Sequence, residues 1–338
     1  MGEKKFVRAR TLILILTNLA SLGGLAWSLR DAHLSQFRDD LASMDWSWVA
    51  VAVAADIGVY CWHGLRWMLL LRPVVKINIG HTVRAIYVGL FANEILPFRI
   101  GELLRYYLMS RWTALPFSVA LSSAMIERVF DGMWLGGCLF VVLRMIELPG
   151  RMGYVEDAGY VLAFIVVGLG LVLAIGMFRR NPSAPVSGNG WRKRYAVLME
   201  DLAIIGHSRY LGIALVQSLP YLLLQVFPIW AAAKGYGLDL PLSAAFVVMV
   251  LVRLGTSIPS APGNLGLFQF FTREILEHVY HVPAAEAGRF SLVLWGIVTL
   301  PLLTAGFVAM LVTESKLTEL RKAAQDEASG LDATRARK

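Results

Sequence analysis

The sequence predicts an all-α polytopic membrane protein with about six full spans and two re-entrant pairs of broken helices, arranged as an inverted repeat. Three observations predict this class. First, 57% of the 338 residues are hydrophobic and only 17% are charged, with a mean hydropathy of +0.59, which leaves too little charge for a soluble surface. Second, several apolar runs approach the ~20 residues that cross a bilayer. Third, proline and glycine interrupt apolar segments at corresponding positions of the two halves, which is typical of binding sites in membrane carriers.

The predicted full spans are 11–29, 47–71, 117–143, 158–178, 210–233 and 290–312. Basic residues precede the first run, as they do in a signal peptide. That run lacks a small-x-small cleavage site and is long for a signal, so we expect an uncleaved anchor. Pro220 and Pro228 predict a kink in the fifth span. Residues 191–207 place apolar side chains among polar neighbours, which predicts an interfacial amphipathic helix.

The distribution of charge predicts how the chain crosses the membrane. Short loops rich in Lys and Arg favour the cytoplasmic side, and such residues occur in 1–10, 72–84, 179–194 and the C-terminal tail. The acidic stretch 31–45 is suited to the outside. Both termini are therefore predicted to be cytoplasmic. This distribution accounts for the net charge of +8 without a nucleic-acid partner.

We expect one transmembrane domain, 1–313, with repeat one at about 47–143 and repeat two at about 209–313. The remaining residues, 314–338, mix charges of both signs and contain few apolar side chains after Leu320. Such a composition cannot bury enough apolar surface to fold by itself. The tail is therefore predicted to be disordered.

The crossing pattern also predicts the two re-entrant pairs. Segment 80–112 must begin and end on the same side of the membrane, and segment 241–281 is its counterpart from the opposite side. Re-entrant backbone is tolerated only when it is buried in protein or lines a wet cavity. The helix-breaking residues are Pro97 and Gly101 in the first pair, and Pro259, Pro262, Gly263 and Gly266 in the second, where Pro259 and Gly263 match Pro97 and Gly101 at an offset of 162. The alternative is that these residues only shape loops.

Charged side chains within these segments define the candidate site, since each costs about 2.5–3.5 kcal/mol at the centre of a membrane helix. In the third span, Arg128 and Asp131 can pair along one helix face. The residues expected to bind or translocate a substrate are Asn93, Glu94, Arg99, Glu102, Arg105, Glu127, Arg128 and Asp131, and the secondary candidates are Asp56, His63, Arg66, Arg253 and Gln269. We interpret the cluster as the lining of a water-accessible cavity. The alternative is a structural network that only joins helices.

The chemistry of this cluster favours an anion. A half-helix that begins after Pro97 presents free backbone N–H groups and the positive end of its dipole within the membrane. Guanidinium groups bind phosphate with two hydrogen bonds at once. Arg99, Arg105 and Arg128 are therefore expected to hold a phosphate-bearing headgroup, and nearby carboxylates to tune them or relay protons.

We expect no cofactor, no bound metal and no catalytic residues. His278 and His281 lie near Glu274 and Glu277, but we interpret them as solvated histidines of an outer loop. The sequence contains no P-loop, no His-Glu-x-x-His and no Gly-x-Ser-x-Gly motif.

The motifs resemble a known family. They are Asn93-x3-Pro97-x3-Gly101-Glu102-x2-Arg105, then Glu127-Arg128-x2-Asp131, and later Pro259-x2-Pro262-Gly263-x2-Gly266-x-Phe268. They resemble the lysylphosphatidylglycerol synthase transmembrane (flippase-like) family over nearly the whole chain. In the bifunctional synthases this region is similar to a lipid-flipping half fused to a soluble aminoacyl-transferase domain. No polar stretch here is long enough for that domain, so we expect a stand-alone member. Gln269 stands where the resemblance leads us to expect an acidic residue.

The resemblance implies translocation without synthesis in the bacterial or archaeal cytoplasmic membrane. Together with the arginines of the cluster, it leads us to expect a protein that flips a polar, phosphate-bearing lipid. One alternative is an integral-membrane transferase or hydrolase that modifies a lipid, with Glu127 or Asp131 as general base. Another is a partner subunit with no transport of its own. The expected partners are a membrane lipid and the bilayer, with a homo-oligomer or a lipid-synthesising enzyme as further possibilities and no nucleic acid.

Overall fold

The computed structural model describes residues 18–95, 100–147, 150, 153–179, 191–257 and 261–335. These residues form helices joined by short connections, with no strand among them. Residues 18–29 are helical. The elements that follow are η1 (Leu34–Gln36), α2 (Phe37–Ser43), α3 (Trp46–Leu71), α4 (Ile79–Ile95), α5 (Ile100–Trp112), α6 (Phe117–Met145), α7 (Tyr154–Arg179), α8 (Trp191–Gly206), α9 (Arg209–Leu223), α10 (Val226–Tyr236), α11 (Leu242–Gly255), η4 (Pro262–Asn264), α12 (Leu267–His278) and α13 (Ala284–Arg335).

Four stretches of helix are long and apolar enough to cross a membrane: Trp46–Leu71, Tyr154–Val172, Arg209–Tyr236 and Ala284–Thr313. They coincide with four of the predicted spans. The predicted third span is α6, which has 29 residues but carries the charged cluster. The predicted first span is described only from Asn18 onward. The all-α polytopic membrane class is therefore confirmed.

The start of α3 shows how a span is anchored at its end. Asp45 accepts hydrogen bonds from the hydroxyl and the backbone N–H of Ser47, the latter at 2.9 Å. This N-cap satisfies one of the donors that the first turn of a helix leaves unpaired. These two bonds hold the pKa of the Asp45 carboxyl below its usual value, and the bond from the Ser47 hydroxyl has the larger effect.

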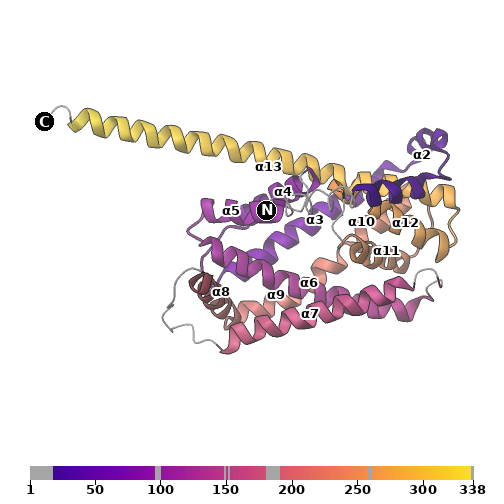
Figure 1. Ribbon diagram of the computed structural model, residues 1–338. Coiled ribbons are helices and arrows are strands. Elements are labelled where there is room, and N and C mark those ends of the chain that lie inside the picture. The colour runs from indigo at the N-terminus through magenta and orange to yellow at the C-terminus, as the bar shows by residue number, and fades with distance from the viewer. Residues whose placement is uncertain are drawn as a thin grey trace, which may run out of the picture.

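Two pairs of short helices occupy the positions of the predicted re-entrant segments. The first pair is α4 and α5, with 17 and 13 residues. The second is α11 and α12, with 14 and 12 residues, and η4 precedes α12. Each is shorter than the ~20 residues that cross a bilayer. Span, short pair and span therefore follow one another twice along the chain. Figure 1 shows α5 and α8 toward one end of the bundle, and α2, α11 and α12 toward the other.

The first pair is a close antiparallel hairpin. A Cβ added at Gly101 would lie 1.9 Å from the carbonyl oxygen of Gly89 and 2.7 Å from Oδ1 of Asn93, and one added at Gly89 would lie 3.0 Å from Cβ of Arg105. Later residues of α5 thus contact earlier residues of α4. Pro97, Arg99 and Pro259 lie outside the described residues.

The second pair is interrupted at glycines, as predicted. Gly263 and Gly266 have φ of 71° and 95°, a region that residues with a Cβ rarely adopt. A Cβ at Gly266 would also lie 1.8 Å from the carbonyl oxygen of Ser21. The break before α12 therefore packs directly against the N-terminal helix, which leaves no room for a side chain.

The fifth span is also divided. It consists of α9 and α10, which meet at Leu224 and Gln225 between Pro220 and Pro228. Proline cannot donate the helix hydrogen bond and its ring crowds the preceding turn. The predicted kink is confirmed, and it leaves the polar side chain of Gln225 inside the bundle.

Two apolar clusters form the core. One contains residues of α3, α10, α11, α12 and α13, such as Ala52 and Leu294. The other contains residues of α3 through α6 and of α8 and α9, such as Trp67 and Met109. Along α3, the buried polar residues Asp56, His63 and Arg66 lie between the segments that belong to each cluster. A polar layer therefore separates the two halves of the core.

The disorder expected of the C-terminal tail stays a prediction, although the last helix continues into it. Helix α13 continues from the sixth span to Arg335, and Figure 1 shows it projecting beyond the bundle. Composition argues only that the segment cannot form its own core. A helix that is already nucleated extends by one hydrogen bond per residue, and Ala, Leu, Glu, Lys and Arg favour that extension. The cytoplasmic location of both termini stays a prediction.

The α4–α5 contact yields a stability test. Gly101→Ala is expected to destabilise the protein by about 1–3 kcal/mol, because the added methyl group collides with the α4 backbone and forces the helices apart. Thermal unfolding of the purified protein in detergent measures the effect. Gly136→Ala on α6 is the control, since nothing lies within 4 Å of the added Cβ and alanine favours a helix by up to about 1 kcal/mol over glycine. Equal melting temperatures for the two variants would contradict the close contact.

Candidate functional site

The centre of the predicted charge cluster is Glu127 on α6, which is 2% exposed. Its Oε1 accepts from Nη2 of Arg66 at 3.0 Å, and its Oε2 accepts from Nη2 of Arg105 at 3.0 Å. Nε2 of His63 lies 3.2 Å from Oε1. One carboxylate thus joins α3, α5 and α6.

The network extends in both directions from this centre. Arg66 also pairs with Asp131 and donates to the hydroxyl of Ser218 on α9 at 3.0 Å. Arg105 pairs with Glu102 at 3.0 Å, and Glu102 pairs with Arg128 at 2.8 Å. Within these ion pairs, three guanidinium groups balance three carboxylates. Such pairing offsets the desolvation of charges that would otherwise be costly in the interior.

The structure therefore brings together most of the predicted site. Glu102, Arg105, Glu127, Arg128 and Asp131 lie in one network with the secondary candidates His63 and Arg66. The predicted bond between Arg128 and Asp131 is not the one formed, because Asp131 pairs with Arg66 and Arg128 pairs with Glu102. The i,i+3 spacing allowed the pair, but partners on α3 and α5 bind these groups instead.

Exposure separates the three arginines. Arg66 and Arg105 have side chains that are only 1% and 3% exposed, whereas the side chain of Arg128 is 49% exposed. Arg128 lies eleven residues after the first residue of α6, about 16 Å along the helix axis, which is near the middle of a ~30 Å hydrocarbon core. Of the arginines in this network, Arg128 has the surface to contact a ligand.

A separate cavity of about 170 Å³ lies where the two short helix pairs meet. Glu94 at the end of α4 and Gly263 and Asn264 of η4 line it together, and η4 packs against α4. Nε1 of Trp295 on α13 donates to the carbonyl oxygen of Gly263 at 2.8 Å. The interrupted ends of both pairs thus face one polar space within the bundle, with side chains of α3, α10, α11 and α13 around it.

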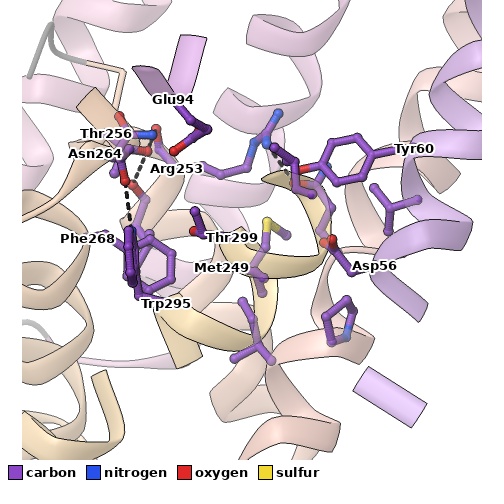
Figure 2. Close-up of a pocket in the computed structure, with 18 residues that line it drawn as sticks. Asp56, Tyr60, Glu94, Met249, Arg253, Thr256, Asn264, Phe268, Trp295 and Thr299 are labelled. Carbon is purple, nitrogen blue, oxygen red and sulfur yellow. Dashed lines mark hydrogen bonds between the residues drawn. The ribbon is translucent and has the colours of Figure 1, made fainter. Parts of the chain in front are cut away.

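Three of the cavity's lining residues are charged: Asp56 on α3, Glu94 on α4 and Arg253 on α11. Nη1 of Arg253 donates to Oε1 of Gln225 at 2.6 Å. Figure 2 shows Asp56 and Tyr60 on one side of the cavity and Glu94, Thr256 and Asn264 on the other. The predicted residues therefore form two sites, a buried ion network and this cavity.

The other predicted residues have identifiable positions. Gln269 is fully buried, and its Oε1 accepts from the backbone N–H of Gly266 at 2.7 Å, so it caps α12. Asn93 lies at the α4–α5 contact beside Gly101. Among the residues of the possible metal cluster, Glu277 pairs with Arg273 at 3.0 Å and Glu274 accepts from Nε1 of Trp27 at 3.0 Å.

Sequence reasoning missed Gln225, Asn264 and Trp295, which line the cavity. Gln225 carried a usable signal, since it is a polar residue between two prolines in an apolar span. Trp295 carried none, because a tryptophan in a span is most simply a packing residue.

The comparison with protein families agrees with this architecture. The model of the lysylphosphatidylglycerol synthase TM region matches residues 12–306. The chain belongs to this family. It is thereby a multi-pass membrane protein, and the resemblance noted from its motifs is confirmed.

The chain is also similar to two proteins of Methanothermobacter thermautotrophicus strain Delta H, each named UPF0104 membrane protein. They are 24% and 22% identical to it, over 74% and 68% of this chain and 78% and 75% of their own lengths. A third relative is glycosyltransferase AglD of Haloferax volcanii, which is 24% identical over 65% of this chain. That match spans only 42% of the glycosyltransferase.

The ion network yields a second stability test. Glu127→Gln keeps the shape of the side chain but leaves Arg66 and Arg105 without their shared counter-charge. We expect a loss of about 3–5 kcal/mol, the usual cost of breaking a buried pair from one side, measured as the free energy of unfolding in mixed detergent micelles. Glu147→Gln, at an exposed position just after α6, is the control and is expected to stay within about 0.5 kcal/mol of the wild type. Similar values for both variants would show that the network does not stabilise the fold.

Proposed function

We propose that this chain translocates a lipid with a polar, phosphate-bearing headgroup from one leaflet of the cytoplasmic membrane to the other. The observation that carries the proposal is the meeting of two short helix pairs at a polar cavity inside the bundle. Short helices that begin and end within a membrane protein are used by carriers to bind substrate near the midplane. The twofold order of span, short pair and span supports movement between two states open to opposite sides.

Arg128 is the residue best placed to bind the headgroup. Its guanidinium is half exposed at mid-depth and is held on one side by Glu102, which leaves further N–H donors of the same group for an anion. A charged group at this depth is costly without a partner. A lipid phosphate would supply that partner with two parallel hydrogen bonds. Arg105, which was predicted to share this role, is assigned a structural one because it is buried between two carboxylates.

Helix α5 also carries exposed apolar side chains. Ile100, Leu103 and Tyr107 project from α5, with exposed fractions of 40%, 53% and 52%. These residues recur at helical spacing on the element that carries Glu102, the partner of Arg128. In the proposed function, the tails stay in hydrocarbon while the headgroup reaches the guanidinium of Arg128.

The family and the relatives support a role in lipid metabolism. The matched family is named for a synthase of a phospholipid, and one relative is named a glycosyltransferase. That name favours a second candidate function, the enzymatic modification of a lipid. Glu127 is a poor general base for it, because both carboxylate oxygens accept from guanidinium groups and the residue is buried. Mass spectrometry of the lipids separates the two candidates, since translocation leaves the mass unchanged.

The test of translocation uses the purified chain in vesicles that contain phosphatidylglycerol with a fluorescent acyl tail. Dithionite added outside destroys the fluorescence of lipid in the outer leaflet, so its arrival there can be timed. Arg128→Gln is expected to slow this movement about 10- to 100-fold, because a hydrogen bond to a charged group is worth about 1.5–3 kcal/mol. Arg144→Gln, at an exposed position near the end of α6, is the control and is expected to match the wild type.

A second lipid tests the role of the phosphate. Galactosyl-diacylglycerol with the same fluorescent tail carries no phosphate, and we expect the wild type to move it more slowly than phosphatidylglycerol. Equal rates for the two lipids, or full activity of Arg128→Gln, would overturn the assignment of Arg128 to phosphate. A change in the mass of the lipid would favour the enzyme instead.

A further inference from the structure

Asp56 differs from the other buried carboxylates. It is 7% exposed, lines the central cavity, and receives no hydrogen bond or ion pair from the described residues. Glu127 and Glu274 are buried to a similar degree, and each accepts hydrogen bonds from side chains. An ionised carboxylate without a partner is strongly disfavoured in such surroundings. The partner of Asp56 must therefore come from the cavity itself.

The position of Asp56 is central in the bundle. It follows the first residue of α3 by ten positions, which is about 15 Å along the helix. Val59, Pro228 and Met249 also line the cavity, and Figure 2 places Asp56 beside Tyr60, away from Glu94 and Asn264. An unpartnered acid at this depth of a carrier marks a functional group rather than a packing one.

Three of the described residues that line the cavity carry a charge. Asp56 on α3 and Glu94 on α4 are acidic, and Arg253 on α11 is basic. The other titratable groups near Asp56 are Tyr60 on its own helix and Tyr87 on α4. The residues that α10, α12, α13 and η4 contribute to the lining carry no charge.

We propose that Asp56 is the site at which this carrier binds a proton during its cycle. The proton adds to a carboxylate oxygen, which forms one O–H bond and gives a neutral carboxylic acid. The same bond breaks when the proton returns to water, so no other reactant is required. A metal cation fits less well, because it would need several oxygen ligands and would be repelled by Arg253.

The role of Asp56 in transport rests on the proposed function. The binding of a proton by Asp56 does not depend on that function. Protonation removes the negative charge of Asp56. A neutral carboxylic acid can be enclosed by apolar side chains, whereas an ionised carboxylate retains water. Proton binding can therefore shift the balance between two states of the carrier, since a ligand shifts such a balance through its different affinity for each state.

Infrared difference spectroscopy on the full chain in lipid nanodiscs tests the binding without any transport. A protonated carboxylic acid has a carbonyl stretching band that the carboxylate lacks. As the pH is lowered from about 8 to about 6, a range in which exposed carboxyl groups with a pKa of about 4 stay ionised, we expect the wild type to gain such a band, Asp56→Asn to lack it, and Asp56→Glu to restore it at a shifted frequency. Asp157→Asn, at an exposed position in the first turn of α7, is the control and is expected to keep the band. A band that persists in Asp56→Asn, or a wild type without one, overturns the assignment.

Transport in vesicles tests the coupling. A pH gradient is expected to change the initial rate of lipid movement in the wild type and in Asp157→Asn, but not in Asp56→Asn. A wild type that moves lipid at a rate unaffected by the pH gradient, or one driven by a sodium gradient at uniform pH, contradicts the coupling role. If the infrared band is lost in Asp56→Asn but the wild type moves no lipid at all, the proton site stands and the proposed translocation fails.

Discussion

The packing of α3, α5 and α6 depends on the ion pairs that the Glu127 carboxylate makes with Arg66 and Arg105. The carboxylate lies between the guanidinium group of Arg66, on the full span α3, and that of Arg105, on the short helix α5. Glu127 itself belongs to α6. Without this counter-charge, Arg66 and Arg105 would be buried cations in an apolar bundle. The same pairing also determines which arginine is available for a ligand. Because Arg66 and Arg105 are enclosed, Arg128 is the member of the network whose side chain is half exposed.

The second organising constraint is that a membrane interior offers no water to backbone groups. Interrupted helices must therefore end against protein or against a cavity that holds polar groups. In this structure the interrupted helices end both against protein groups and against a cavity. The Gly263 carbonyl accepts from the indole of Trp295, the Gly266 amide donates to Gln269, and the adjoining space contains the carboxylates of Asp56 and Glu94. The break that weakens the helix thus creates the site.

These two features divide the polar residues by role. The network of paired charges holds α3, α5, α6 and α9 together. The cavity is lined by residues of both short helix pairs. Arg128 and Asp56 belong to different sites, so the proposed headgroup and the proposed proton would not compete directly. Their helices, α3 and α6, are joined through Arg66, which pairs with Glu127 and Asp131.

The sequence by itself determined the class, the spans and the short pairs, because apolar length and interruptions by proline and glycine are local properties that a membrane makes decisive. It also identified the charged residues, since a charge within an apolar run is conspicuous. Only the tertiary structure decided which charges neutralise one another, because partners such as Arg66 and Asp131 are 65 residues apart and the spacing along α6 favoured another pair. The tertiary structure also places Asp56, Glu94 and Arg253 around one cavity, apart from the ion network. Their proximity arises from the packing of α3, α4 and α11, and no local sequence pattern indicates it.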